Sequence, residues 1–140
     1  MIRNLNKKDK TNFQIYCSQV GNNLFTDCSF KNLEKEFKNL LKYNNLCLID
    51  EENSEFRGLL FIQKIDNKNY LKVIYKNSKI LDRLLNVLFW NFKEDLIFKL
   101  NDYKVVHVIK NNFFRFNGKE NLDYIYIRKY FKKDKTNGSV

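Results

Sequence analysis

The chain has 140 residues and a formal net charge of +10 at pH 7, with 26 Lys and Arg against 16 Asp and Glu. This length is typical of a single domain with one hydrophobic core. No segment reaches the roughly 18 consecutive apolar residues of a membrane span, and residues 1–10 lack the apolar core of a signal peptide. The sequence therefore argues against a membrane-spanning or secreted protein, and we expect a cytoplasmic location.

The amino-acid composition is strongly biased. Pro and Ala are absent, Gly occurs four times, and Lys (21), Asn (21) and Phe (13) are abundant, as expected of an AT-rich coding sequence. Only five of the 26 basic residues are Arg, the residue favoured for bidentate phosphate recognition. We therefore attribute most of the positive charge to Lys-rich codon usage and not to nucleic-acid binding.

The charge is unevenly distributed along the chain. Asp50, Glu51, Glu52 and Glu55 form an acidic turn, whereas basic residues gather near the C-terminus. Such a basic segment attracts nucleic acid, anionic surfaces or acidic proteins alike. The candidates for binding a partner are Arg128, Lys129, Lys132, Lys133 and Lys135.

The three cysteines, Cys17, Cys28 and Cys47, lack CxxC spacing, and their odd number argues against a disulfide framework. We expect reduced, mostly buried thiols. His107 is the single histidine and lies in an apolar segment, so a Cys/His metal site would need carboxylates from elsewhere. We predict no metal site. We expect His107 to be a sheet-surface or core residue and not the partner of a catalytic cysteine.

The first third of the chain predicts one strand and two helices. Residues 1–5 can form a short strand, and Asp9 is a candidate N-cap for a helix that Gly21 would end. Ser29 is a second candidate N-cap. The apolar residues after it recur at the spacing of an amphipathic helix, and they are Leu33, Phe37, Leu40 and Leu41.

The middle of the chain changes to strand-like runs, which short polar clusters separate. This pattern predicts a three-stranded antiparallel meander. The runs are residues 46–49, 56–65 and 70–75. Ser78 is then the candidate N-cap of a long apolar stripe, which predicts either one helix to about Asn101 or a helix that breaks near Asn91.

The last third predicts further strands. Residues 103–109 are rich in β-branched side chains, and the runs 113–116 and 124–130 are also strand-like. Asn117-Gly118 is a hairpin signal, so we expect the last two strands to pair antiparallel. Residues 132–140 are polar, and we expect them to form a flexible basic tail.

The order of these predicted elements resembles the GNAT acetyltransferase superfamily. The resemblance rests on the opening segment Met1-Ile2-Arg3-Asn4-Leu5 and on the closing segments Phe113-Phe114-Arg115-Phe116-Asn117-Gly118-Lys119 and Tyr126-Ile127-Arg128-Lys129. It implies one GNAT-like domain over residues 1–131, of the α/β (α+β) class. The implied sheet is mixed and largely antiparallel, with about six to seven strands flanked by about three helices. It also implies a cofactor cleft where two strands splay apart, expected near Tyr75 and Val105.

The family holds the pyrophosphate of acetyl-CoA on a Gly-rich loop at a helix N-terminus, where backbone amides approach the anion. The corresponding segment here, residues 75–80, contains no Gly. Lys76, Asn77, Ser78 and Lys79 form a degenerate loop, in which the lysines attract phosphate but bulky side chains hinder a close approach. We therefore predict no bound cofactor, and acetyl-CoA only if the chain is an active enzyme.

A second departure concerns the catalytic groups. After the strand that would match residues 103–109, the family usually has a short helix with a Tyr that protonates the departing thiolate, and residues 110–112 leave no room for it. Glu51, Glu52 and Glu55 are available as a base that deprotonates an amine. We expect them to be solvated surface charges, and we predict no catalytic residue.

The leading hypothesis is therefore a non-catalytic GNAT-like module with a structural or protein-interaction role. A phage or mobile-element accessory protein of a capsid or tail, located in the virion, would fit this description. Two alternatives stay open, namely a divergent acyl-CoA-dependent N-acetyltransferase and a basic nucleic-acid-binding protein. We expect a protein partner, in an oligomeric assembly, and no membrane. No motif supports nucleic-acid recognition.

Overall fold

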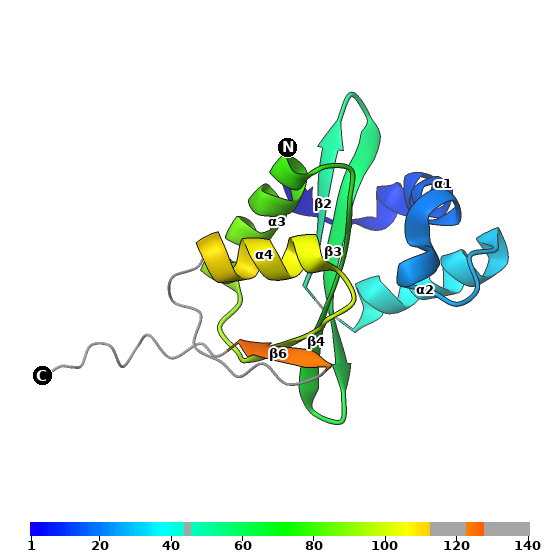
Figure 1. Ribbon diagram of the computed structural model, residues 1–140. Helices are drawn as coiled ribbons and strands as arrows, with labels where there is room; N and C mark the ends of the chain where they lie inside the picture. Colours follow the sequence, from blue (N-terminus) through cyan, green and yellow to red (C-terminus); the bar gives the residue numbers. More distant parts are fainter. Residues whose placement is uncertain (44–45, 113–122, 128–140) are drawn as a thin grey trace, which may run out of the picture.

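The computed structural model describes residues 1–43, 46–112 and 123–127, which form a six-stranded sheet with helices on both faces. Helices α1 (Lys10–Val20) and α2 (Phe30–Lys42) cover one face, and α3 (Ser78–Asn91) and α4 (Tyr103–Asn112) cover the other (Figure 1). The predicted class and the mixed, largely antiparallel sheet are confirmed. The described ranges contain four α-helices, where about three were expected.

The N-terminal elements form as the sequence predicts, although Asp9 stands at the N-cap position of α1 without a side-chain cap hydrogen bond and binds Arg3 instead. Strand β1 (Ile2–Asn4) is followed by α1 and α2, with the short 3-10 helices η1 (Lys7–Asp9) and η2 (Gly21–Asn23) on either side of α1. Ser29 caps α2, because its hydroxyl accepts a hydrogen bond from the Asn32 amide at 3.3 Å. The predicted apolar stripe of α2 is buried against the sheet.

The predicted antiparallel meander is present and consists of β2 (Cys47–Glu52), β3 (Glu55–Ile65) and β4 (Lys68–Tyr75). Both connections are two-residue turns in which the backbone φ is positive. These turn residues are Asn53, Ser54, Asp66 and Asn67. Turns of this kind match the twist of paired strands, and Asn and Asp tolerate the left-handed conformation better than most residues. The tight turns therefore fix the register of the meander.

The apolar stripe after Ser78 is divided between a helix and a strand. Helix α3 ends at Asn91, so the predicted break is confirmed and the single long helix is wrong. Strand β5 (Leu96–Lys99) forms the rest of the stripe, and its first three residues are buried. A strand that is buried on both faces reads as a continuous apolar run, which hydrophobic periodicity cannot distinguish from a helix.

The strand predicted at residues 103–109 is wrong, because these residues belong to helix α4. Val105, Val108 and Ile109 are buried, which is the i, i+3, i+4 spacing of a helical stripe. The β-branched composition favoured a strand, but propensity is weak and packing overrides it. The predicted position of His107 in a sheet is wrong for the same reason.

The strands follow one another across the sheet in the order β1-β2-β3-β4-β5-β6. All neighbours are antiparallel except β4 and β5, which run parallel and register at the single pair Tyr70–Ile97. The last strand, β6 (Tyr124–Ile127), pairs with β5. The predicted strand at 113–116, its hairpin and the predicted tail at 132–140 lie outside the described residues.

Gly58 on β3 determines how closely α3 approaches the sheet. A Cβ at this position would lie 2.8 Å from both Ile80 Cγ2 and Leu84 Cδ1. Because glycine has no side chain, the first turns of α3 pack directly on the strand.

Within the described residues, no helix is long and apolar enough to cross a membrane.

Candidate functional site

The parallel strands β4 and β5 bring two helix N-termini to one edge of the sheet. β4 leads into α3 and β5 leads into α4, and strands that run in the same direction end at the same edge. The two helices also contact each other. The first turn of a helix offers backbone amides without intrahelical acceptors, together with the positive end of the helix dipole. This edge is therefore a candidate anion-binding site.

The first turn of α3 exposes amides and lysines together. Asn77, and not the predicted Ser78, is the N-cap, since its side-chain oxygen accepts a hydrogen bond from the Ile80 amide at 3.0 Å. The first intrahelical bond runs from the Leu81 amide to the Asn77 carbonyl, so the amides of Ser78 and Lys79 have no acceptor within the helix. The residues of the predicted degenerate loop, Lys76, Asn77, Ser78 and Lys79, are all exposed.

The start of α4 is tied to the end of β4 through Asp102. The Oδ1 atom of Asp102 accepts hydrogen bonds from the amides of Lys104 at 2.9 Å and Val105 at 3.4 Å, and so caps α4. Tyr75, the last residue of β4, donates its hydroxyl to Oδ2 of Asp102 at 2.8 Å. Burial and this carboxylate raise the pKa of the Tyr75 phenol well above its ordinary value, so the phenol keeps its proton.

A groove of about 620 Å³ runs from Ser78 of α3 along α4. Its volume is within the range of small-molecule sites, roughly 300–1,000 Å³. The polar residues of α4 that line it are Tyr103, Lys104, His107 and Lys110. The side chain of Lys104 is exposed, and the exposed Lys76 and Lys79 lie on either side of Ser78. The groove therefore has a positive rim next to two helix N-termini.

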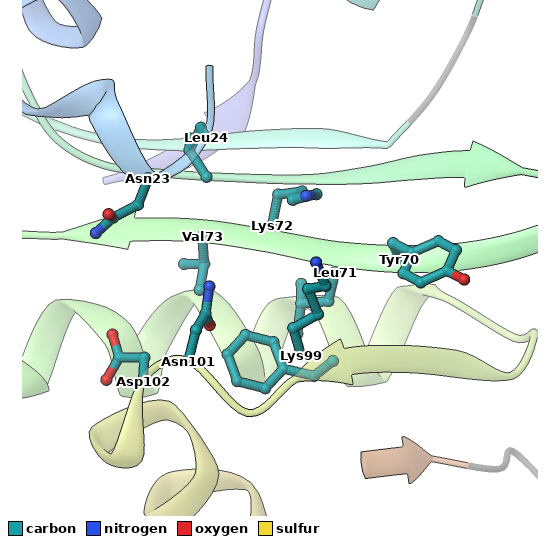
Figure 2. Close-up of a pocket in the computed structure, with 10 residues that line it drawn as sticks. Asn23, Leu24, Tyr70, Leu71, Lys72, Val73, Lys99, Asn101 and Asp102 are labelled. Carbon is teal, nitrogen blue, oxygen red and sulfur yellow. The ribbon is translucent and has the colours of Figure 1, made fainter. Parts of the chain in front are cut away.

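A second pocket, of about 50 Å³, lies between β4 and β5 (Figure 2). Its walls come from both strands and from the connection between α1 and α2. They are Asn23, Leu24, Tyr70, Leu71, Lys72, Val73, Phe98, Lys99, Asn101 and Asp102. Asp102 lines this pocket and Tyr103 lines the groove, so the two openings adjoin at the contact between Tyr75 and Asp102.

The prediction that no helix follows the strand beside β4 is wrong. Helix α4 follows β5, and it carries Tyr103, whose side chain is 87 % exposed and lines the groove with Ser78. The strand beside β4 is β5, and not the segment around Val105, which belongs to α4. A usable signal was present in the sequence, because Asp102 is a good N-cap directly before a helically spaced apolar stripe.

The acidic segment does not lie in the groove or in the pocket. Asp50 is fully buried in β2 and forms an ion pair with Arg83 of α3 at 2.9 Å. Glu52 and Glu55 are exposed, as expected. Glu51 is instead half-buried and forms an ion pair with Arg3 at 3.0 Å.

The thiols and the imidazole lie on opposite faces of the sheet. Cys17 and Cys47 are buried and Cys28 is half-buried in the core beneath α1 and α2, so mostly buried thiols are confirmed. Burial raises the pKa of Cys17 to about 12, which makes it a poor nucleophile at neutral pH. His107 is exposed on α4.

The candidate partner-binding residues Arg128, Lys129, Lys132, Lys133 and Lys135 lie outside the described residues.

Solved acetyltransferase structures share this arrangement of elements. An acetyltransferase of the GNAT family from Streptococcus pneumoniae superimposes with a TM-score of 0.63 over 91% of this chain and 96% of that chain, at 16% identity. A putative acetyltransferase from Salmonella typhimurium with its cofactor acetyl-CoA gives a TM-score of 0.63 over 93% and 94% of the two chains, at 13% identity. The chain has the GNAT fold.

The GNAT fold is also shared with an aminoglycoside 6'-acetyltransferase type Ii, at a TM-score of 0.64 and 10% identity over 91% of this chain and 94% of that chain. Identities this low establish the fold alone. No protein-family model and no curated protein matches the chain by sequence. The resemblance expected from the order of elements is thus confirmed, even though the strand assigned to residues 103–109 was wrong.

Proposed function

We propose that this chain is a divergent N-acyltransferase that binds acyl-CoA along the groove between α3 and α4. The observation that carries the proposal is the convergence of two helix N-termini, behind parallel strands of a GNAT fold, on a groove of about 620 Å³. Two of the three similar solved structures named above are of acetyltransferases, and the third is of a putative acetyltransferase with acetyl-CoA. The presence of α4 supports the same function, because its expected absence was an argument against catalysis.

The residues around the groove fit the phosphate groups of coenzyme A. Phosphates bind favourably at helix N-termini, where amides and the helix dipole face the anion. The amides of Ser78 and Lys79 are in this position, and Lys104 adds an exposed positive charge. Because residues 75–80 contain no Gly, the backbone cannot wrap the anion closely. We therefore expect binding that depends strongly on salt concentration.

Acyl transfer also needs a proton donor for the departing thiolate. Acyl-CoA would supply the thioester: the amine would attack its carbonyl carbon, the C–S bond would break, and the attacking amine would lose a proton to solvent. Tyr103 lies in the first turn of α4 and lines the groove, so we assign it the role of donating the proton. Replacing Tyr103 with Phe is expected to slow acyl transfer by about 100-fold or more, since general acid catalysis contributes about 10²–10⁴-fold. The affinity for coenzyme A should not change.

Calorimetric titration with coenzyme A tests the proposal. We expect saturable binding that weakens by about tenfold in Lys104→Glu, because reversing a charge next to a phosphate costs at least the strength of one charge-assisted hydrogen bond. Lys31→Glu, at an exposed position of α2 on the other face of the sheet, is the matched control and should bind like the wild type. An absence of saturable binding, or equal losses in both variants, would overturn the proposal.

A non-catalytic GNAT-like protein-interaction module is the second candidate. Two observations favour it. Residues 75–80 have no Gly to let the backbone approach a phosphate. The pocket between β4 and β5, where a cofactor cleft was expected, is only about 50 Å³. If coenzyme A fails to bind, this function is the better one. Its partner would be a protein, in an oligomeric assembly. A capsid or tail role in a virion and binding to nucleic acid stay predictions from the sequence.

A further inference from the structure

The pocket between β4 and β5 contains one lysine from each strand. Tyr70 is paired with Ile97 in parallel register, so Lys72 and Lys99 occupy matching positions two residues further along. Side chains at matching positions leave a sheet on the same face. Tyr70, Lys72 and Lys99 line the pocket together with Asn23, which belongs to η2 on the α1 and α2 face (Figure 2).

The ammonium group of the half-buried Lys72 has an unfavourable environment, with the exposed Lys99 beside it on the next strand. Like charges on neighbouring strands repel each other, and burial together with the charge of Lys99 lowers the pKa of Lys72. None of the ion pairs among residues 1–43, 46–112 and 123–127 involves either lysine. Asp102 is the carboxylate that lines the pocket, and its oxygens already accept hydrogen bonds from Tyr75 and from the amides of α4. A bound anion would neutralise the pair.

The size of the pocket limits the anion. A cavity needs about 10–15 Å³ by this measure to hold one water molecule, so about 50 Å³ holds a group of a few heavy atoms. A carboxylate or a phosphate group fits this volume, whereas an extended chain does not. Asn101 also lines the pocket, and its side-chain amide offers a neutral donor.

We propose that Lys72 and Lys99 bind a small oxyanion, either a carboxylate or a phosphate, in this pocket. Asn23 and Leu24 close the pocket on the α1 and α2 side, although Leu71, Val73 and Phe98 of the opposite core also line it. The groove lies along α4 on the other face, so an acceptor that enters from the α1 and α2 side would not compete with a ligand in the groove. The identity of the ligand rests on the proposed acyltransferase function: the oxyanion is part of the acyl acceptor, the amine that receives the acyl group. The acceptor is then an amine that carries a carboxylate or a phosphate, and not a polycation.

Titration with inorganic phosphate and, separately, with succinate tests this inference, with sodium chloride at matched ionic strength as the reference. We expect at least one of the two anions to bind saturably by calorimetry, and the better one identifies the preferred group. Lys72→Gln and Lys99→Gln should each weaken this binding by about tenfold, the loss expected for one charge-assisted hydrogen bond. Lys64→Gln, on an exposed position of β3, should bind like the wild type.

Several results distinguish this inference from the proposed function. Lys72→Gln should unfold at a temperature no lower than the wild type in the absence of anion, because the repulsion is removed. Lys104→Glu should weaken coenzyme A binding but leave the smaller anion unaffected. If phosphate and succinate act no differently from chloride, or if both lysine variants bind them like the wild type, the inference is overturned even where coenzyme A binds. If the anions bind through the lysines but coenzyme A does not bind, the pocket is supported and the proposed function is overturned.

Discussion

Tyr75 and Asp102 connect the ends of the two parallel strands. The phenol at the end of β4 donates a hydrogen bond of 2.8 Å to the carboxylate that caps α4. This contact lies where the groove along α4 adjoins the pocket between the strands. It links the end of β4 to the start of α4 at the edge of the sheet where the candidate site lies.

Replacing Tyr75 with Phe removes this hydrogen bond. We expect the free energy of unfolding to fall by about 1–2 kcal/mol, since the bond is to a charged group but only partly buried. Urea denaturation measures the change. In a double-mutant cycle, the second variant is Asp102→Asn, which keeps an oxygen for capping. The double variant should lose less unfolding free energy than the sum of the losses in the two single variants. Strictly additive effects would show that the two side chains do not interact.

Replacing Gly58 with Ala should destabilise the fold. The added Cβ would lie 2.8 Å from Ile80 Cγ2 and Leu84 Cδ1, which forces α3 away from β3. Overpacking of this kind costs about 1–3 kcal/mol, measurable by urea denaturation. Asn86→Ala, at an exposed position of α3, is the control and should change stability by no more than about 0.5 kcal/mol. A Gly58→Ala variant as stable as this control would contradict the packing described here.

Replacing Ser54 with Gly should stabilise the chain. Ser54 has a φ of 65° in the turn between β2 and β3, a conformation that costs a residue with a Cβ about 1–2 kcal/mol. Glycine is less restricted in the unfolded chain, which offsets part of this gain, so we expect a net stabilisation of about 0.5–1 kcal/mol. Thermal unfolding measures it. A destabilised variant would mean that the turn does not require positive φ.

Stability should decrease at alkaline pH. Burial raises the pKa of Cys17 to about 12 and also raises the pKa of Cys47, whereas thiols of the unfolded chain titrate near about 8.5. The unfolded state therefore loses protons that the folded state retains. The contribution to stability is complete below about pH 8.5 and is lost as the pH rises toward the folded pKa. Urea denaturation at several pH values should show this decline, and Cys17→Val should show a shallower one. If stability declines equally steeply with pH in the wild type and in Cys17→Val, Cys17 is not a source of this pH dependence.

Much of the fold could be predicted where each element has its own pattern. The apolar stripe of α2 follows an N-cap serine, and polar two-residue turns separate the strands of the meander. β5 and α4 could not be identified in this way. Leu96, Ile97 and Phe98 are all buried because neighbouring elements cover both faces of the strand, so their run continues the pattern of α3 without a break in apolar character.

The candidate site was predicted only in part. The position of residues 76–79 at the start of α3 was predicted, because a strand, a short polar segment and a helix follow one another in sequence. Tyr103 was missed because its segment was read as a strand. The Tyr75–Asp102 contact and the pairing of Lys72 with Lys99 depend on the parallel register of β4 and β5. Residues far apart in a single sequence carry no local signal of such contacts.

In the proposed function, the converging N-termini of α3 and α4 bind the phosphates of acyl-CoA. The most direct test follows the backbone amide resonances of ¹⁵N-labelled protein during titration with coenzyme A. We predict that the largest saturable shifts occur at Ser78, Lys79 and Lys104. If these amides do not shift while coenzyme A is in large excess, or if the shifts occur only on the α1 and α2 face, the claim is contradicted.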